Sequence, residues 1–175
     1  MDNSKFGISD IKRYTNVFTE LEHQSILKYL ERPKWRYGHV SSTIDFKNAP
    51  PFWSMTLIYD EFFTKHLLNR ICKITGDDLE LDTVYANGQT YGQSGQPHQD
   101  SLQDNERTFI YYPETFWDIR WNGKTVFMTN EGITYTIPNP NTAVYFPGII
   151  KHYAEETARA FGGLRKTIAW KLRLK

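Results

Sequence analysis

Two short segments of the chain carry side chains that could bind one metal ion. In the first, GQSGQPHQD at residues 92–100, His98 and Asp100 stand two positions apart behind a loop of Gly, Ser and Pro. Residues i and i+2 of a strand point to the same face, so a strand beginning here would present both side chains together. A His-x-Asp pair alone is a weak signal, because such triplets often arise by chance.

The second segment, NTAVYFPGIIKH at residues 141–152, ends on a histidine. Its residues 144–146 predict a buried strand, Pro147-Gly148 a turn, and His152 the first strongly polar side chain that could point back inward. Two histidines and one carboxylate form the facial triad of non-haem Fe(II) oxygenases, which leaves coordination positions open. His98, Asp100 and His152 are therefore the candidate metal ligands and catalytic residues.

A candidate anion site follows in the alternating segment LRKTIAW, residues 164–170. Arg165 and Thr167 share one face of this segment, and a guanidinium and a hydroxyl suit a single carboxylate. Arg159 and Arg173 are competing cations, but an ordinary surface charge explains either of them.

In this order the motifs resemble the 2-oxoglutarate- and Fe(II)-dependent dioxygenases, in particular their prolyl 4-hydroxylase-like branch. That family has His-x-Asp, a distal His after a Phe-Pro strand, and an Arg on the next strand. Residues 109–127, with FIYYP, WD and GKTVF, are similar to a second family segment. The resemblance runs from about residue 82 to the C-terminus.

The chain departs from the family pattern in two places. Arg165 lies 13 positions beyond His152, farther than is usual in the family, although a longer turn at residues 161–163 could absorb the difference. Gly123-Lys124 stands where the family usually has Gly-Glu, in a turn before a strand, which casts little doubt on the metal site.

The resemblance implies an α+β fold: a double-stranded β-helix (jelly-roll) core with two or more N-terminal helices packed on one sheet. It implies Fe(II), with 2-oxoglutarate and O2 as co-substrates, and leaves room for ascorbate. Arg165 would bind the distal carboxylate of 2-oxoglutarate, with Thr167 and Tyr111 adding hydroxyls. Tyr85 and Tyr91 compete for the place of another pocket tyrosine.

The reaction implied is hydroxylation of an unactivated C–H bond, first of all in a prolyl residue of a peptide or protein. A free amino acid, another small molecule or an alkylated base is the alternative substrate, and the net charge of +1 argues against nucleic acid. A rival of another class is a non-catalytic, metal-containing jelly-roll binding module, which leaves Arg165 without a role.

Substrate contacts are the least defined part of the prediction. The loop at residues 48–53 is a candidate lid. The candidate walls of a shallow cleft are Trp53, Tyr91, Arg107 and Trp121. His39 lies on a predicted strand near this cleft and could contact substrate, although a surface position is the favoured interpretation.

Composition favours one domain over residues 1–175, with a helical part at about 1–78 and a β-rich catalytic core at about 79–175. The lone Cys72 excludes an internal disulfide framework and is compatible with a reducing compartment. No signal pattern or membrane-spanning run stands out, so we expect a soluble cytoplasmic protein without a membrane partner. The sequence leaves the oligomeric state open.

Hydrophobic periodicity predicts a helix capped by Thr15 or Asn16 and running to about residue 31, and a second from residue 60 to Gly76. His23 and His66 are interpreted as ordinary helical histidines, and Lys171 and Lys175 as solvated charges. The predicted loop is 44–53, and the predicted strands are 35–42, 79–86, 98–102, 107–112, 125–128, 133–137, 142–146, 153–156 and 167–174.

Overall fold

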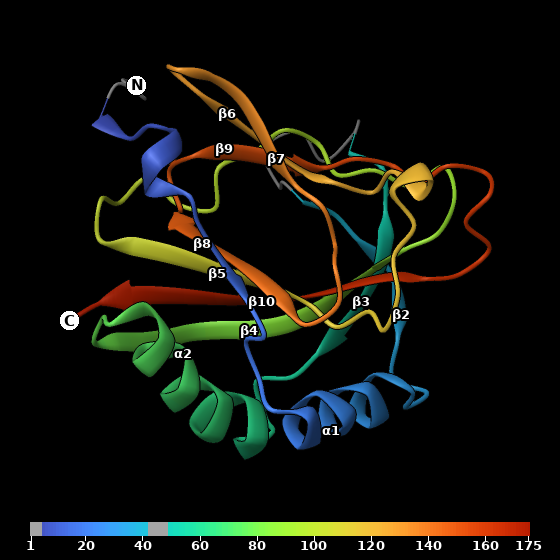
Figure 1. The fold of residues 1–175 in the computed structure, drawn as a ribbon, viewed down its shortest axis with the longest axis horizontal. Helices are drawn as coiled ribbons and strands as arrows, with labels where there is room; N and C mark the ends of the chain where they lie inside the picture. The colour runs from blue at the N-terminus through green and yellow to red at the C-terminus, as the bar shows by residue number, and fades with distance from the viewer. Residues whose placement is uncertain (1–4, 42–48) are drawn as a thin grey trace.

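The computed structural model describes residues 5–41 and 49–175, whose strands form one seven-stranded and one three-stranded antiparallel sheet (Figure 1). The protein is therefore mostly β, with few helices. The larger sheet has the order β1 (Lys12–Thr15), β8 (Thr142–Pro147), β5 (Glu106–Tyr112), β10 (Arg165–Leu174), β4 (Leu79–Gln89), β3 (Phe52–Thr56) and β2 (Arg36–His39). The smaller sheet has the order β7 (Gly132–Thr136), β6 (Thr125–Thr129) and β9 (Lys151–Ala154).

The helices α1 (Glu20–Leu30) and α2 (Leu68–Thr75) lie against one face of the larger sheet, and the smaller sheet lies across its other face (Figure 1). Two cores result. One joins the helices to the larger sheet around Trp170, and the other fills the space between the sheets around Phe127 and Phe146. No helix of the described segments is long and apolar enough to cross a bilayer.

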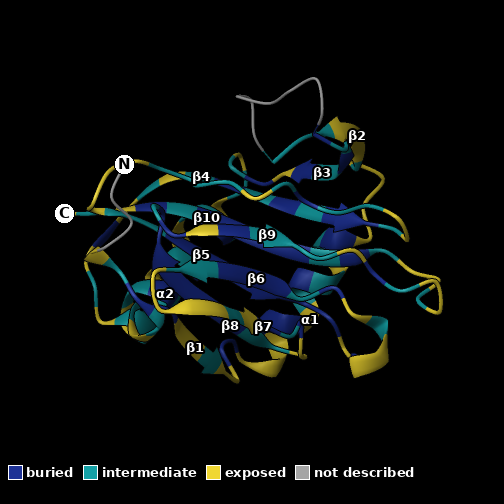
Figure 2. Cartoon of the chain, turned by 90° about the horizontal axis from the view of Figure 1, so that it is seen from above, coloured by how far each residue is buried: buried dark blue, intermediate teal, exposed yellow. Residues whose placement is uncertain are grey.

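The central strand β10 separates these two cores by simple alternation. Ile168, Trp170 and Leu172 pack toward the helices, while Ala169 joins the core between the sheets. Successive side chains of a strand point to opposite faces. Polar residues two or four positions from Ala169 therefore also point between the sheets. Figure 2 shows how strongly the middle of the larger sheet is buried.

Helix α1 begins with a capping box rather than at the predicted Thr15 or Asn16. The Thr19 hydroxyl accepts a hydrogen bond from the Glu22 backbone N–H, and the Glu22 carboxylate accepts one from the Thr19 N–H. The predicted caps were wrong because Thr15 belongs to strand β1 and Asn16 has φ 52°, outside the extended region an N-cap needs.

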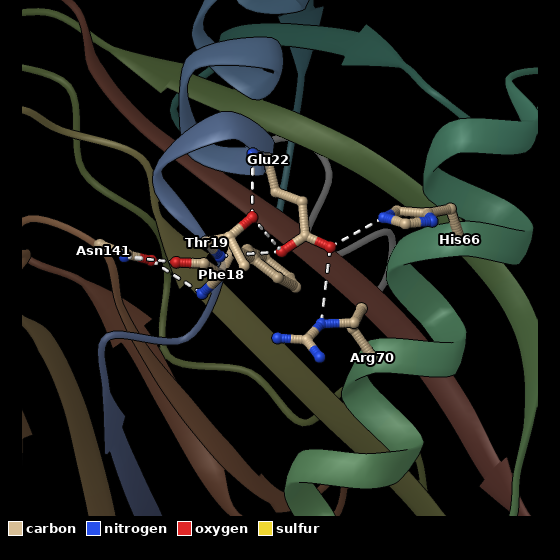
Figure 3. A network of polar contacts seen from close by, with 6 residues as sticks. All are labelled: Phe18, Thr19, Glu22, His66, Arg70 and Asn141. Atoms are coloured by element: carbon tan, nitrogen blue, oxygen red, sulfur yellow. Dashed lines mark hydrogen bonds and ion pairs between the residues drawn. The ribbon is translucent and has the colours of Figure 1, made fainter.

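The same carboxylate ties α1 to the second helical segment (Figure 3). Oε1 of Glu22 lies 2.7 Å from His66 Nε2 and 3.5 Å from Arg70 Nε. His66 lies in a π-helical turn, η3 (Phe62–Leu67), which runs directly into α2. This helical segment ends where predicted, because Gly76 has φ 79° and adopts the left-handed conformation of a helix C-cap.

The strand predictions need three corrections. Residues 98–102 form only an isolated bridge between His98 and His152, not a strand. Residues 52–56, which fell partly in the predicted loop, form β3 directly after Pro51, while residues 44–48 of that loop lie outside the described segments. The part before residue 79 is also less helical than predicted, since it supplies β1, β2 and β3 to the larger sheet.

The cap of α1 can be tested by substitution. Thr19→Ala removes the side-chain acceptor of the capping box, so we expect the free energy of unfolding to fall by about 1 kcal/mol. Ser25→Ala is the matched control, because its hydroxyl only bonds the Leu21 carbonyl within the same helix and its loss should cost little. Urea denaturation of both variants and the wild type measures the difference; equal losses would contradict the capping role.

Candidate metal and co-substrate site

Three potential metal ligands converge between the sheets. His98 and His152 exchange backbone hydrogen bonds of 3.0 and 2.9 Å, so the loop before Asp100 lies directly beside β9. The backbone N–H of Asp100 then donates to the Gly148 carbonyl at 2.9 Å, which turns its carboxylate inward. The potential ligand atoms of the three side chains all lie within 4.8 Å of one another.

The backbone fixes the tautomer of both imidazoles. Nδ1 of His98 lies 2.7 Å from the Gln96 carbonyl oxygen, and Nδ1 of His152 lies 2.9 Å from the Ile150 carbonyl oxygen. A carbonyl oxygen only accepts, so each Nδ1 carries the proton and each Nε2 presents a bare lone pair. Burial also lowers the pKa of His152 to about 4, which keeps that ring neutral near pH 7.

The Asp100 carboxylate is ionised and engaged through one of its oxygens. Its Oδ2 accepts a hydrogen bond of 2.6 Å from the Thr108 hydroxyl and forms an ion pair with Lys171. Burial would raise the pKa of Asp100, but Lys171, His152 and His98 outweigh it and hold that pKa well below its usual range. The prediction that Lys171 is a solvated charge was wrong, because β10 directs it between the sheets.

Arg165 is a fully buried cation, with an exposed fraction of 1%. Its guanidinium donates to the Gly123 carbonyl at 2.5 Å, to Gln89 Oε1 at 2.9 Å and to Thr125 Oγ1 at 3.2 Å. Gly123 permits this approach, since it has φ 73° and a Cβ there would lie 3.1 Å from Arg165 Cδ. All three acceptors are neutral.

Within residues 5–41 and 49–175, no carboxylate forms an ion pair with Arg165. A buried charge without a counter-ion is costly, so this guanidinium is suited to an anion that arrives from solvent. The competing cations behave differently: Arg173 is half exposed and pairs with Glu106, and Arg159 lies on the surface.

One cavity of about 340 Å³ connects the three ligands to Arg165. Thr167 lies in its wall between them, as does Asn87, whose buried Oδ1 has no hydrogen-bond partner among the described residues. The volume falls within the range of small-molecule sites. A metal at one end and an anion at the other would share this space.

Tyr111 does not belong to this cavity, which corrects its predicted role. Its hydroxyl lies 2.5 Å from His23 Nδ1 and donates to Asn141 Oδ1 at 3.0 Å, on the helix side of the larger sheet. The neighbouring Tyr112 points between the sheets and donates to Thr125 Oγ1, which itself bonds Arg165. Neighbouring residues of a strand point to opposite faces, so the sequence alone does not show which of two adjacent tyrosines points between the sheets.

Of the two competing tyrosines, the structure places Tyr85 in the cavity wall and leaves Tyr91 56% exposed outside it. His39, interpreted from the sequence as a surface residue, lines the same cavity beside Tyr85. Trp53, Arg107 and Trp121 are not part of the wall. Trp121 instead packs with Trp117 and Phe161. Phe161 lies in the loop before β10, which accommodates the long spacing from His152.

Sequence reasoning missed several residues that shape the site. Lys171 could have been found by extending the alternation of Arg165 and Thr167 by two further steps along the strand. Gln89 and Thr125 carry no local signal, since their role depends on which strands flank Arg165. The missed residues are Asn87, Gln89, Thr108, Tyr112, Thr125 and Lys171.

Solved structures match nearly the whole chain at low sequence identity. A prolyl 4-hydroxylase from Pseudomonas putida has 12% identity and a TM-score of 0.71, with 94% of this chain and 92% of that chain covered. A prolyl hydroxylase from Trichoplax adhaerens, in complex with a peptide of the hypoxia inducible factor oxygen degradation domain, has 13% identity, a TM-score of 0.72 and coverages of 95% and 84%. This chain has the fold of the prolyl 4-hydroxylases.

A third structure widens the range of ligands found on this fold. HygX from Streptomyces hygroscopicus, with nickel, 2-oxoglutarate and hygromycin B bound, has 11% identity, a TM-score of 0.63 and coverages of 95% and 83%. No protein-family model matches the sequence, and no curated protein matches it significantly. The resemblance predicted from the motifs is confirmed at the level of the fold, and the likeness implies a jelly roll.

Metal binding by the three converging side chains can be tested directly. His98→Ala removes one lone pair, and we expect Mn²⁺ affinity to fall at least about 100-fold, the upper end of what losing an outer-shell partner costs. His39→Ala is the matched control, because this imidazole lines the same cavity without joining the ligand group. Calorimetric titration of the two variants should separate them; similar affinities would place the metal elsewhere.

Proposed function

We propose that this chain is an Fe(II)- and 2-oxoglutarate-dependent oxygenase that hydroxylates an unactivated C–H bond. One observation carries the proposal: three converging metal ligands and a buried guanidinium without a carboxylate partner among the described residues line the same cavity. A structural metal site would explain the ligands alone. It would not explain a fixed cation held across the cavity from them.

The ligand group fits a divalent metal such as Fe(II). Two neutral imidazoles and one carboxylate compensate only half of a 2+ charge and leave positions open, as in facial-triad oxygenases. When bound, iron would supply the activation of O2 by which such enzymes oxidise a C–H bond. The contribution of His98, Asp100 and His152 is to hold it on one side, facing the cavity.

The far end of the cavity fits the distal carboxylate of 2-oxoglutarate. Arg165 presents a planar guanidinium that suits a carboxylate, and Gln89, Thr125 and the Gly123 carbonyl hold that group in place. Thr167 is two positions along the same strand and face, so its hydroxyl can reach the same ligand. The opposite end of 2-oxoglutarate, its 2-oxo acid group, would then lie at the metal.

The substrate we propose is a prolyl residue in a peptide or protein. The cavity wall beside the metal ligands is aromatic: His39 lies 5.2 Å from Phe52 and 5.5 Å from Tyr85 between ring centroids. Such a wall suits a compact apolar ring. The likeness to a prolyl hydroxylase that binds a peptide supports this class, whereas hygromycin B in HygX makes a small molecule the alternative.

Turnover of the co-substrate is the first test of this function. With Fe(II) and O2, we expect the wild-type protein to convert 2-oxoglutarate to succinate, and His98→Ala to lose that activity because the metal is no longer held. Succinate formation can be followed by mass spectrometry, with and without ascorbate as an auxiliary reductant. Equal turnover by both proteins would end the assignment.

The same assay separates the substrate classes. Incubation with a library of proline-containing peptides, and separately with a pool of metabolites, should give a product heavier by one oxygen in the peptide library. Oxygen gain confined to the metabolite pool would identify the small-molecule alternative. Metal binding with no succinate and no oxygen gain in either pool would instead support the non-catalytic binding module.

The role of Arg165 can be tested without removing its charge. Arg165→Lys keeps a cation but loses the planar fork, so we expect the KM for 2-oxoglutarate to rise at least about tenfold. Arg173→Lys is the matched control, since it makes the same change on an exposed position of the same strand. A KM unchanged in Arg165→Lys would show that the co-substrate binds elsewhere.

A further inference from the structure

Two donors meet on the same oxygen of Asp100. The Thr108 hydroxyl donates to Oδ2 at 2.6 Å, and the Lys171 ammonium pairs with that same atom. A carboxylate oxygen has two lone pairs, and these two partners satisfy both. Oδ2 also lies 3.4 Å from His152 Nε2, so both oxygens border the ligand group, but Oδ1, 3.3 Å from His98 Nε2, is the one whose lone pairs these two donors leave available to a metal.

We propose that Lys171 is a positioning residue that restricts Asp100 to one metal-binding oxygen and so keeps a coordination position open for the co-substrate. The inference rests on the proposed function. A carboxylate that is free to rotate can bind a metal through both oxygens. The second oxygen would then occupy a position that a chelating 2-oxo acid needs.

The structure holds Lys171 firmly in this place. It lies on the inner face of β10 with only 18% of its side chain exposed, and its Nζ lies 5.9 Å from the Tyr85 ring centroid. Arg165 stands on the same face of the same strand, six residues earlier. Lys171 thus marks the metal end of the cavity and Arg165 the far end.

The two roles of Lys171 predict opposite effects on two affinities. Without its charge, a metal ion meets less repulsion and gains access to Oδ2, so metal binding should not weaken. The 2-oxo acid would lose both an open position and a nearby positive charge, so its binding should weaken. Damage to the pocket as a whole would instead lower both affinities.

The test is calorimetric titration under argon, with Mn²⁺ in place of iron to prevent turnover. We expect Lys171→Met to bind Mn²⁺ at least as tightly as the wild type and the Mn²⁺-loaded variant to bind 2-oxoglutarate at least about tenfold more weakly. Thr108→Val, which removes one of the two donors on Oδ2 while keeping the side-chain shape, should shift 2-oxoglutarate affinity in the same direction by less. Lys175→Met, an exposed change directly after the end of the same strand, should alter neither affinity.

Unchanged 2-oxoglutarate affinity in Lys171→Met would overturn the inference, and so would a parallel fall in both affinities. Should Lys171→Met fail to fold, Thr108→Val decides alone, because a wild-type 2-oxoglutarate affinity there would contradict the weakening that the inference predicts when Oδ2 loses a donor. A wild-type protein that binds Mn²⁺ but no 2-oxoglutarate would remove the proposed function itself, and the inference with it.

Discussion

The register of β10 determines where both cations of the site, Arg165 and Lys171, lie. Trp170 is fully buried on the helix side, where it packs against Phe18, Phe63 and Phe109 and donates its Nε1–H to the Phe63 carbonyl. A shift of one residue would move this indole into the cavity and drive two cations into the apolar core under the helices. The aromatic packing on one face of the strand therefore fixes the electrostatics of the other.

The two cations on that face are stabilised in different ways. Lys171 has an ionised partner in Asp100, so the pair carries little net charge before any ligand binds. Arg165 donates only to neutral acceptors and has no carboxylate ion-pair partner within the described residues. Breaking one of these networks would leave a buried polar group unpaired, which is why they are costly to alter. The Arg165 end of the cavity is therefore suited to bind an anion.

The sequence was most informative where chemistry requires particular residue types at short spacing. His98 and Asp100 converge as predicted, although the predicted reason was wrong. They lie in a loop that is bound to β9 and to the Gly148 carbonyl, and not on a strand. The two side chains still point the same way because the loop is extended and its backbone is hydrogen-bonded at both residues. Residues two positions apart in such a loop face the same side, as they would on a strand.

Prediction failed where the answer depends on strand neighbours. Tyr111 and Tyr112 are identical in type, and only the pairing of β5 with β10 and β8 determines which one points between the sheets. Lys171 resembles a surface lysine near the C-terminus until β4 and β5 flank its strand on both sides. Strand β3 was obscured by Pro50 and Pro51, because prolines signal a loop even when a strand begins directly after them.

The site also depends on how closely the two sheets approach one another. His152 belongs to the smaller sheet, whereas Arg165 and Lys171 belong to the larger one. The core between the sheets sets their separation, with Phe146 lying 4.9 Å from Phe127 and 4.8 Å from His152 between ring centroids. Close-packed interiors transmit changes of even one methylene group. The packing of these phenylalanines against each other and against His152 therefore helps to set the distance between the potential metal ligands and Arg165.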